Sequence, residues 1–249
     1  MLKLVLRFGA AALLLFLLWL AGSRALGPDL LPDPVTTASA FATSLTDPDF
    51  LRHALLSLGR LAGGLGAAVL VSFPLGLLMG HVRALDWIAA PVTFLTYPIP
   101  KIVLLPVFFT LVGLGDASRL LLIGLTTGYQ ILVIVREGAL ALDPALEKAF
   151  RSMGGNTMQL VRHVWLPAAL PSLFTSLKVA SGTAMAVLFL AESFATDAGL
   201  GWLIMDAWGM GDVLRMFVGI LGMSLLGVLL YGAVAAAERV ACRWMFVRH

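Results

Sequence analysis

Two ionisable residues lie in apolar surroundings, and these are the positions at which the chain could handle a charged solute. Lys101 stands in the stretch Pro98-Ile-Pro-Lys-Ile-Val-Leu-Leu-Pro106. A charged side chain within a membrane usually faces a cavity or a partner, and helix-breaking prolines free backbone groups that protein or water must satisfy. One interpretation is a positive group on a translocation path. The other is a lysine that reaches the membrane interface from a kinked helix.

Glu192 is the second of these residues, and it follows the apolar run 187–191. It could pair with Lys101 or an arginine, form part of an outer gate, or sit in water. We expect that its side chain sits in water. A polar patch at 126–130 (Thr-Thr-Gly-Tyr-Gln) interrupts another apolar stretch. Such groups bond across helices more often than they line a pore. The pathway candidates are Tyr97, Lys101, Thr127, Gln130 and Glu192.

Motifs for covalent chemistry are missing from the sequence. It contains no phosphate-binding G-x-x-x-x-G-K-[ST], no G-x-S-x-G nucleophile turn and no H-E-x-x-H metal spacing. The single cysteine, Cys242, excludes an internal disulfide framework. We therefore expect a protein that is not an enzyme, with no catalytic residue, metal or cofactor.

The composition indicates an all-α protein that crosses a membrane several times. Hydrophobic residues make up 60% of the chain and charged residues 12%, with mean hydropathy +0.96, whereas soluble domains carry about 25% charged residues. The net charge of +3 fits basic cytoplasmic loops better than a nucleic-acid partner.

Six apolar stretches predict six transmembrane helices. The first follows Lys3 and Arg7 and is either a signal peptide with small residues at 21–23 or, as we expect, an uncleaved helix. An extracytoplasmic linker with a short helix at 37–45 completes an N-terminal region, 1–50. The third stretch is broken by prolines. The expected spans are 8–22, 56–80, 87–114, 120–135, 173–191 and 214–236.

Basic residues predict the orientation, because they concentrate in cytoplasmic loops. Six spans place both termini on one side, and that side carries most of the basic residues. The residues expected to be cytoplasmic are Lys3, Arg7, Arg83, Arg136, Lys148, Arg151, Arg162, Arg239, Arg243 and Arg248, with Lys178 near the boundary. Those expected on the opposite side are Arg24, Arg52, Arg60, Arg119 and Arg215.

The stretch from Asp143 to Pro171 is the longest polar and charged run between two apolar blocks. Asp143 and Pro144 suit the start of a helix, and Leu146, Ala149, Phe150 and Met153 then recur on one helical face. Gly154-Gly155 suits a helix stop. Asn156 with Gln159 forms a capping-box pattern for a second helix, which we expect to end before Pro167. Two short amphipathic helices around a glycine elbow suit either docking to a soluble partner or lying on the bilayer.

This loop resembles the cytoplasmic EAA-type loop of permease subunits of bacterial binding-protein-dependent ABC importers. That loop reads roughly E-A-A-x-x-x-G, nine residues, I-x-L-P; Gly154 places Val164 and Leu166-Pro167 in register, while Lys148 stands where the glutamate belongs and Glu147 is one position early. The motifs Gly138, Asp143-Pro144, Pro98–Lys101, Leu105-Pro106 and Glu192 with Gly199-Leu-Gly201 are similar to those of the sulfonate, taurine and nitrate branch.

The resemblance implies a type I importer (MetI-like) transmembrane domain over about 51–240, followed by a basic cytoplasmic tail, 241–249. It implies two ABC ATPase subunits docked on cytoplasmic coupling helices, an extracytoplasmic substrate-binding protein, and a second permease copy in the lipid of the bacterial inner membrane. The outer segment 197–212 would be a second partner surface. The ATPase-coupling residues would be Leu146, Glu147, Ala149, Phe150, Arg151, Met153, Gly154 and Gly155.

The expected cargo is a small solute such as nitrate, a sulfonate or taurine, or alternatively a pyrimidine-type vitamin precursor. A stand-alone channel or ion-coupled carrier is the competing class, although such carriers tend to show internal repeats and none is visible here. Pairs such as Gly76-x-x-x-Gly80 allow close helix approach and are weak evidence of a subunit interface. Phe150→Asp is expected to uncouple transport without unfolding the spans.

Overall fold

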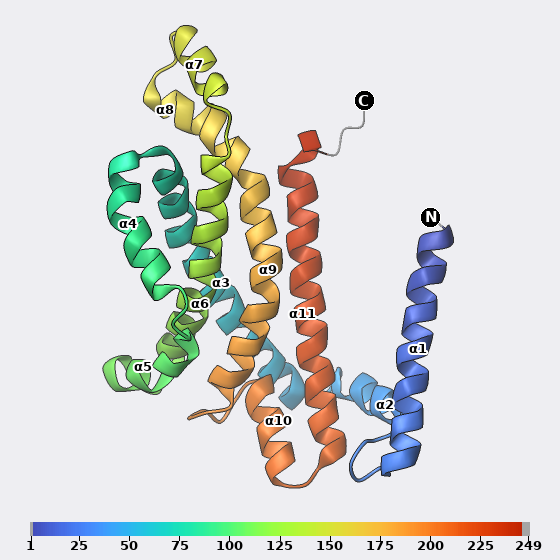
Figure 1. Cartoon of the computed structure of the whole chain (residues 1–249). Coiled ribbons are helices and arrows are strands. Elements are labelled where there is room, and N and C mark those ends of the chain that lie inside the picture. The colour runs from blue at the N-terminus through green and yellow to red at the C-terminus, as the bar shows by residue number, and fades with distance from the viewer. Residues whose placement is uncertain (1, 246–249) are drawn as a thin grey trace. The chain divides into compact units, whose positions relative to one another are not determined.

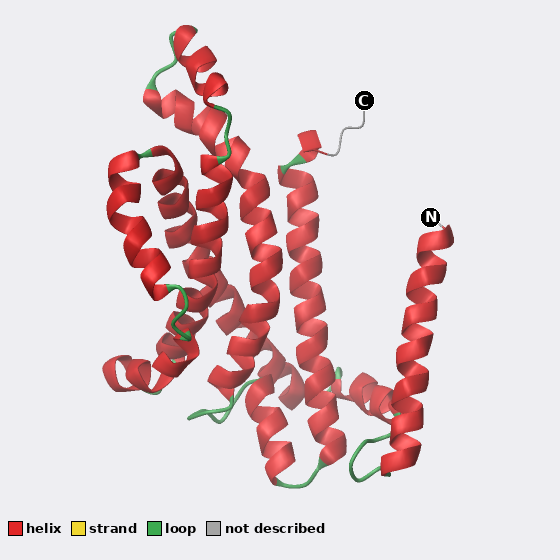
Figure 2. Ribbon diagram, in the orientation of Figure 1, coloured by secondary structure: helices red, strands yellow, loops and turns green. Residues whose placement is uncertain are grey.

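The structure, a computed structural model, describes the backbone of residues 2–245 and, apart from residues 2–5 and 8, their side chains. This part of the chain consists of helices and connecting loops (Figure 2), as expected. The elements are α1 (Leu2–Leu26), α2 (Pro34–Ser44), α3 (Pro48–His81), α4 (Arg83–Thr96), η1 (Lys101–Leu104), α5 (Leu105–Val112), α6 (Asp116–Leu140), α7 (Pro144–Ser152), α8 (Thr157–Leu160), η2 (Val161–Trp165), α9 (Leu166–Glu192), α10 (Leu200–Gly209), α11 (Val213–Ala241) and η3 (Arg243–Met245).

Five helices in the described part are long and apolar enough to cross a membrane: α1, α3, α6, the run Thr157–Glu192 and α11. The pair Arg83–Thr96 and Lys101–Val112 passes the same test but bends by 87°, which raises the number to six if the pair is one span. Pro98 and Pro100 lie at the bend, and their missing backbone donors prevent a continuous helix. The third expected span is therefore a bent pair.

Two compact units divide the chain. Unit 1 comprises Met1–Ser57 and Glu192–Leu225, and unit 2 comprises Leu58–Ala191 and Leu226–His249. The long helices α3 and α11 each contribute residues to both units. The expected division at residues 50 and 240 remains a prediction, and residues 246–249 of the expected basic tail lie outside the described part.

Unit 1 contains the N-terminal helix and the short helix α2. The Asp33 side chain caps α2, whose first residue is Pro34, so the short helix expected in the linker is confirmed. Trp19 of α1 donates its indole N–H to the Pro32 carbonyl at 3.0 Å, and its ring centroid lies 6.0 Å from that of Phe217. These contacts tie α1 to the linker that follows it.

Close packing of α3 against α6 forms the centre of unit 2. A Cβ atom on Gly80 would come within 2.3 Å of the Ala139 side chain, and one on Gly76 within 2.7 Å of the Leu132 carbonyl oxygen. Small residues are what permit such an approach. This glycine pair, weak evidence of a subunit contact in the sequence, therefore packs two helices of the same chain together.

The apolar core of unit 2 draws on α3, α6, η2 and α9, and it reaches into the loop after α6. In Figure 1, α7 and α8 extend beyond the ends of α6 and α9 that they connect. The buried core residues are Ala68, Leu77, Ile131, Val135, Ala139, Leu160, Trp165, Ala169 and Leu173.

Ion pairs mark the two ends of the α3–α6 pair. Arg136 binds Asp86 of α4 through both carboxylate oxygens, at 2.6 and 2.7 Å, at the end next to the loop. Arg60 binds Asp116 at 2.8 Å at the start of α6. Arg136 and Arg60 thus lie at opposite ends of the α3–α6 pair, and the side of the membrane that each faces remains a prediction. The predicted cytoplasmic residues Lys3 and Arg248 lie outside the described side chains.

Candidate functional site: the loop between α6 and α9

The first loop helix, α7, forms where local sequence signals predict it. The Asp143 side chain accepts a hydrogen bond from the Ala145 backbone N–H at 2.8 Å, and Pro144 occupies the first turn. Three of its nine residues are charged (Glu147, Lys148 and Arg151), and no residue of α7 is buried. The helix is therefore a projecting element rather than part of the core.

A glycine elbow ends α7. Gly154 has φ +84°, a left-handed conformation that glycine adopts without steric cost. The Phe150 ring folds back over Gly155, where a Cβ atom would lie only 2.2 Å from Cε1 of that ring. The two glycines thus have different tasks, one turning the chain and the other making room for the ring.

The second loop helix starts with the capping box predicted from the sequence. Asn156 Oδ1 accepts the Gln159 backbone N–H, and Gln159 Oε1 accepts the Asn156 backbone N–H, each at 2.9 Å. This reciprocal pair satisfies two backbone donors that a helix start leaves open.

The expected end of this helix before Pro167 is wrong. The helix passes through a π-helical turn, η2, and continues into α9, so that one helical run covers Thr157–Glu192. Proline lacks a backbone N–H and its ring crowds the carbonyl one turn earlier. We attribute the tolerance of Pro167 to the wider turn directly before it, which changes the spacing of those carbonyls.

Burial divides the loop into an anchored part and an open part. Leu160 and Trp165 are 0% and 6% exposed and belong to the core of unit 2, whereas Leu146, Met153 and Met158 are 53%, 77% and 76% exposed. Phe150 is only partly exposed because it packs against this core and the elbow. The predicted apolar face is therefore split: Leu146, Ala149 and Met153 are exposed and Phe150 turns inward.

Glu147 connects α7 to the rest of unit 2, a role that the sequence did not reveal. Its Oε1 atom accepts the indole N–H of Trp165 at 2.8 Å and lies 3.2 Å from Nδ1 of His81 at the end of α3. Of the other predicted coupling residues, Arg151 is exposed near the end of α7.

Lys101, the main pathway candidate, is partly exposed at the bend between α4 and η1. Its Nζ donates hydrogen bonds to the carbonyl oxygens of Thr96 and Tyr97 at 3.0 and 2.6 Å, and it lies 4.1 Å from the centre of the Tyr129 ring. A cation favours helix C-terminal carbonyls and aromatic faces. Lys101 therefore stabilises the bend as well as carrying a positive charge there.

Two residues of the polar patch of α6 bond across helices, as expected, whereas Thr126 and Thr127 bond within α6 itself. Tyr129 Oη lies 2.8 Å from Thr96 Oγ1, and Gln130 Nε2 donates to Thr183 Oγ1 of α9 at 3.0 Å. Thr127 is fully buried and donates to the Ile123 carbonyl of its own helix. Among the described residues, Gln130 Oε1 is the buried side-chain polar atom without a hydrogen-bond partner.

The expectation that Glu192 sits in water is wrong, because this side chain is 0% exposed. Ser57 donates its hydroxyl to both carboxylate oxygens at 2.9 and 2.8 Å, and the Gly201 backbone N–H donates to Oε2 at 2.9 Å. Ser57 also accepts the Leu200 backbone N–H at 2.8 Å. Glu192 thus holds the start of α10, within unit 1.

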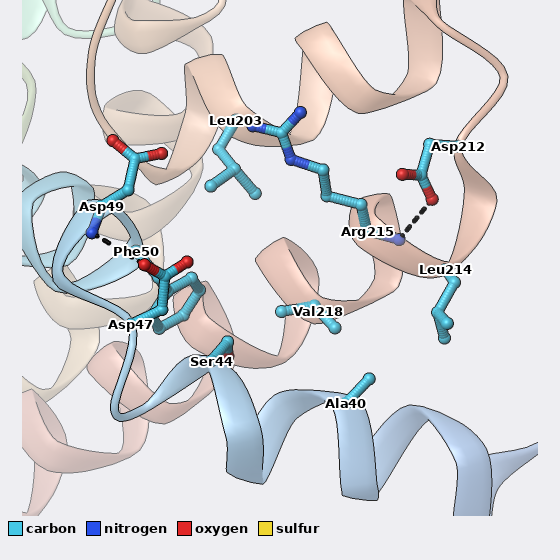
Figure 3. Close-up of a pocket in the computed structure, with 10 residues that line it drawn as sticks. All are labelled: Ala40, Ser44, Asp47, Asp49, Phe50, Leu203, Asp212, Leu214, Arg215 and Val218. Carbon is cyan, nitrogen blue, oxygen red and sulfur yellow. Dashed lines mark hydrogen bonds between the residues drawn. The ribbon is translucent and has the colours of Figure 1, made fainter.

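The outer segment expected as a second partner surface, 197–212, contains α10 and borders a pocket of about 290 Å³ in unit 1 (Figure 3). Asp47 accepts the Asp49 backbone N–H at 3.1 Å, and Asp212 accepts the Arg215 backbone N–H at 2.9 Å, as the dashed lines in Figure 3 show. These carboxylates cap helix starts. No three metal-ligating side chains gather among the described residues.

A protein-family model and several known proteins match this chain. The family model for the binding-protein-dependent transport system inner membrane component matches residues 72–240. The chain is 28% identical to the taurine transport system permease protein TauC of Escherichia coli (strain K12), covering 92% of this chain and 84% of that protein. It is 25% identical to the putative aliphatic sulfonates transport permease protein SsuC of Bacillus subtilis (strain 168), covering 90% and 82%.

A third relative, the formylaminopyrimidine transport permease protein ThiX of Halalkalibacterium halodurans, is 27% identical and covers 93% of each chain. Among solved structures, the MetNI methionine ABC transporter in inward facing conformations matches with a TM-score of 0.64 at 22% identity, covering 77% of this chain and 95% of that one. This likeness concerns the fold, and it confirms the expected MetI-like transmembrane architecture.

The family model spans more than half of the chain, and the helical architecture agrees with it. This chain therefore belongs to the family of inner membrane components of binding-protein-dependent transport systems, and it is a non-catalytic permease subunit of an ABC importer.

Proposed function

We propose that this permease moves a small sulfonate or taurine-like solute and is driven by a separate ATPase that docks on the loop 143–171. The observation that carries the docking proposal is the split in the loop. Leu160 and Trp165 anchor the helical run that leads into α9, while Leu146 on α7, Met153 at the end of α7 and Met158 on α8 expose apolar side chains. An anchored base with an open apolar end suits transmission of movement from a soluble partner.

The docking surface that we propose consists of Leu146, Ala149, Met153 and Met158, with Arg151 at its rim. Glu147, Phe150, Gly154 and Gly155 shape the loop that presents this surface. Two ATPase subunits would serve two permease copies, because the six transmembrane helices of one copy are too few to enclose a central pathway. An extracytoplasmic binding protein would deliver the solute, with 197–212 as its contact. Both chain termini would then be cytoplasmic.

The substrate proposal rests on the names of the relatives TauC and SsuC, and ThiX makes a formylaminopyrimidine-type compound the alternative. Tyr97, Lys101 and Gln130 are our pathway candidates, since each keeps partial exposure and Lys101 would attract an anionic group. Thr127 and Glu192 are fully buried, so we propose no solute contact for them in this conformation.

Reconstitution into proteoliposomes tests the proposal. The permease, the ATPase and the binding protein encoded beside it should give ATP-dependent uptake of radiolabelled taurine, and unlabelled alkanesulfonates should compete. Competition by a formylaminopyrimidine instead would move the substrate to the alternative class. Uptake by the permease alone, without ATPase or ATP, would contradict the importer mechanism and indicate a stand-alone channel.

A further inference from the structure

Three side chains from separate elements of unit 2 meet beneath α7. The His81 ring, at the end of α3, stacks on the Trp165 ring of η2 with centroids 4.0 Å apart and an interplanar angle of 5°. Stacking places the indole N–H and the imidazole Nδ1 side by side. Both face the same atom, Glu147 Oε1, at 2.8 and 3.2 Å.

The rings and the carboxylate differ in their surroundings. Trp165 is 6% exposed, and the side chain of His81 is also 6% exposed, whereas the side chain of Glu147 is 29% exposed. The ring pair is therefore a fixed part of the core, and the carboxylate is a contact from outside that can be made or broken.

Few other contacts fix the direction of α7. None of its residues is buried, and its inward-facing apolar side chain, Phe150, packs against the elbow and the core of unit 2 near the C-terminal end of the helix. Glu147 lies one turn earlier and supplies a polar contact to α3. Without it, α7 would be held by Phe150 and by its two ends, and it could move more freely relative to α3.

We propose that Glu147 is a positioning residue that links α7 to the end of α3 through His81 and Trp165, so that displacement of α7 is passed to α3 as well as to α9. The transport consequence rests on the function proposed above, in which an ATPase displaces α7. The link itself is a property of this chain alone.

Distance measurements on the isolated permease test the link without any partner. Spin labels would be placed at Lys148→Cys in α7 and Arg83→Cys at the start of α4, both exposed positions, in a chain with Cys242→Ser. We expect a narrow distance distribution with Glu147 present and at least a twofold broader one with Glu147→Ala. Glu137→Ala is the matched control, because this glutamate of α6 is 58% exposed and pairs with Arg136. Equal widths in all three chains would overturn the proposal.

Transport measurements test the consequence in the full complex. We expect Glu147→Ala to retain the ATPase on co-purification but to lower solute transported per ATP hydrolysed at least fivefold, with Glu147→Gln intermediate and Glu137→Ala unchanged. His81→Ala combined with Glu147→Ala should be no worse than the worse single variant, since both break one link. Additive losses, or a normal transport ratio in Glu147→Ala, would overturn the proposal. Absence of ATP-driven transport in the unsubstituted complex would instead contradict the proposed function and leave the distance test standing.

Discussion

The corners that precede and follow α9 in the chain are both built around a glutamate, and they differ in how that glutamate is enclosed. Glu192 is 0% exposed and is bound by Ser57 and the Gly201 backbone N–H. Glu147 has a 29% exposed side chain and contacts Trp165 and His81. The Glu192 corner belongs to unit 1 and the Glu147 corner to unit 2.

This difference separates fixed architecture from a movable joint. A buried polar group that loses its partner costs the full desolvation penalty, so the Glu192 corner has one stable arrangement. The Glu147 carboxylate is partly exposed, so water can solvate it when α7 is displaced. The loop before α9 can thus move more easily than the start of α10.

Replacement of Glu192 by alanine should have the largest effect on stability. It leaves the Ser57 hydroxyl and the Gly201 N–H buried without their acceptor, and a buried unsatisfied donor costs about 1–3 kcal/mol. The thermal unfolding midpoint of the detergent-solubilised chain should therefore fall by several degrees. Glu137→Ala is the control, and equal midpoints for both variants would show that the Glu192 corner is not the rigid one.

Phe150→Asp should have an intermediate effect on stability, and this effect should be confined to the loop 143–171. The ring is half-buried against Gly155 and the core, and full removal of a core Phe costs about 3–5 kcal/mol, so about half that loss is expected here. Hydrogen exchange at the amides of 146–160 should accelerate while the amides of α3 and α6 keep their protection. Slow exchange throughout the loop would mean that Phe150 does not anchor it.

Met153→Asp should leave stability unchanged, because this side chain is 77% exposed and such surface substitutions change stability by no more than about 0.5 kcal/mol. Its effect should appear in docking, as at least tenfold weaker binding of the ATPase to the permease in nanodiscs. Unaltered ATPase affinity would remove Met153 from the proposed docking surface.

Local signals made the loop 143–171 predictable from the sequence. Asp143-Pro144, Gly154 and the Asn156–Gln159 pair act within one turn of the backbone, and each forms the cap or turn expected of it. Hydropathy likewise located the long helices, because a membrane requires about 20 apolar residues in succession.

Contacts between distant parts of the chain were not predictable in this way. Helical periodicity grouped Phe150 with Met153, but it could not tell whether the face meets the protein itself or a partner. The position of Glu192 at the end of an apolar run suggested that its side chain is exposed to water. The local sequence does not show that residues 199–201 fold back over it. Glu147 gave no sign of its partners His81 and Trp165 for the same reason.

The π-helical turn Val161–Trp165 sets the rotational phase of the loop. A turn of this kind holds one residue more than an α-helical turn, and one residue corresponds to about 100° of rotation around the helix axis. Deleting a single residue there would swing α7 and α8 by about a quarter of a revolution and aim Met153 and Leu146 at a different neighbour. The direction in which α7 and α8 project therefore depends on the one extra residue of this turn.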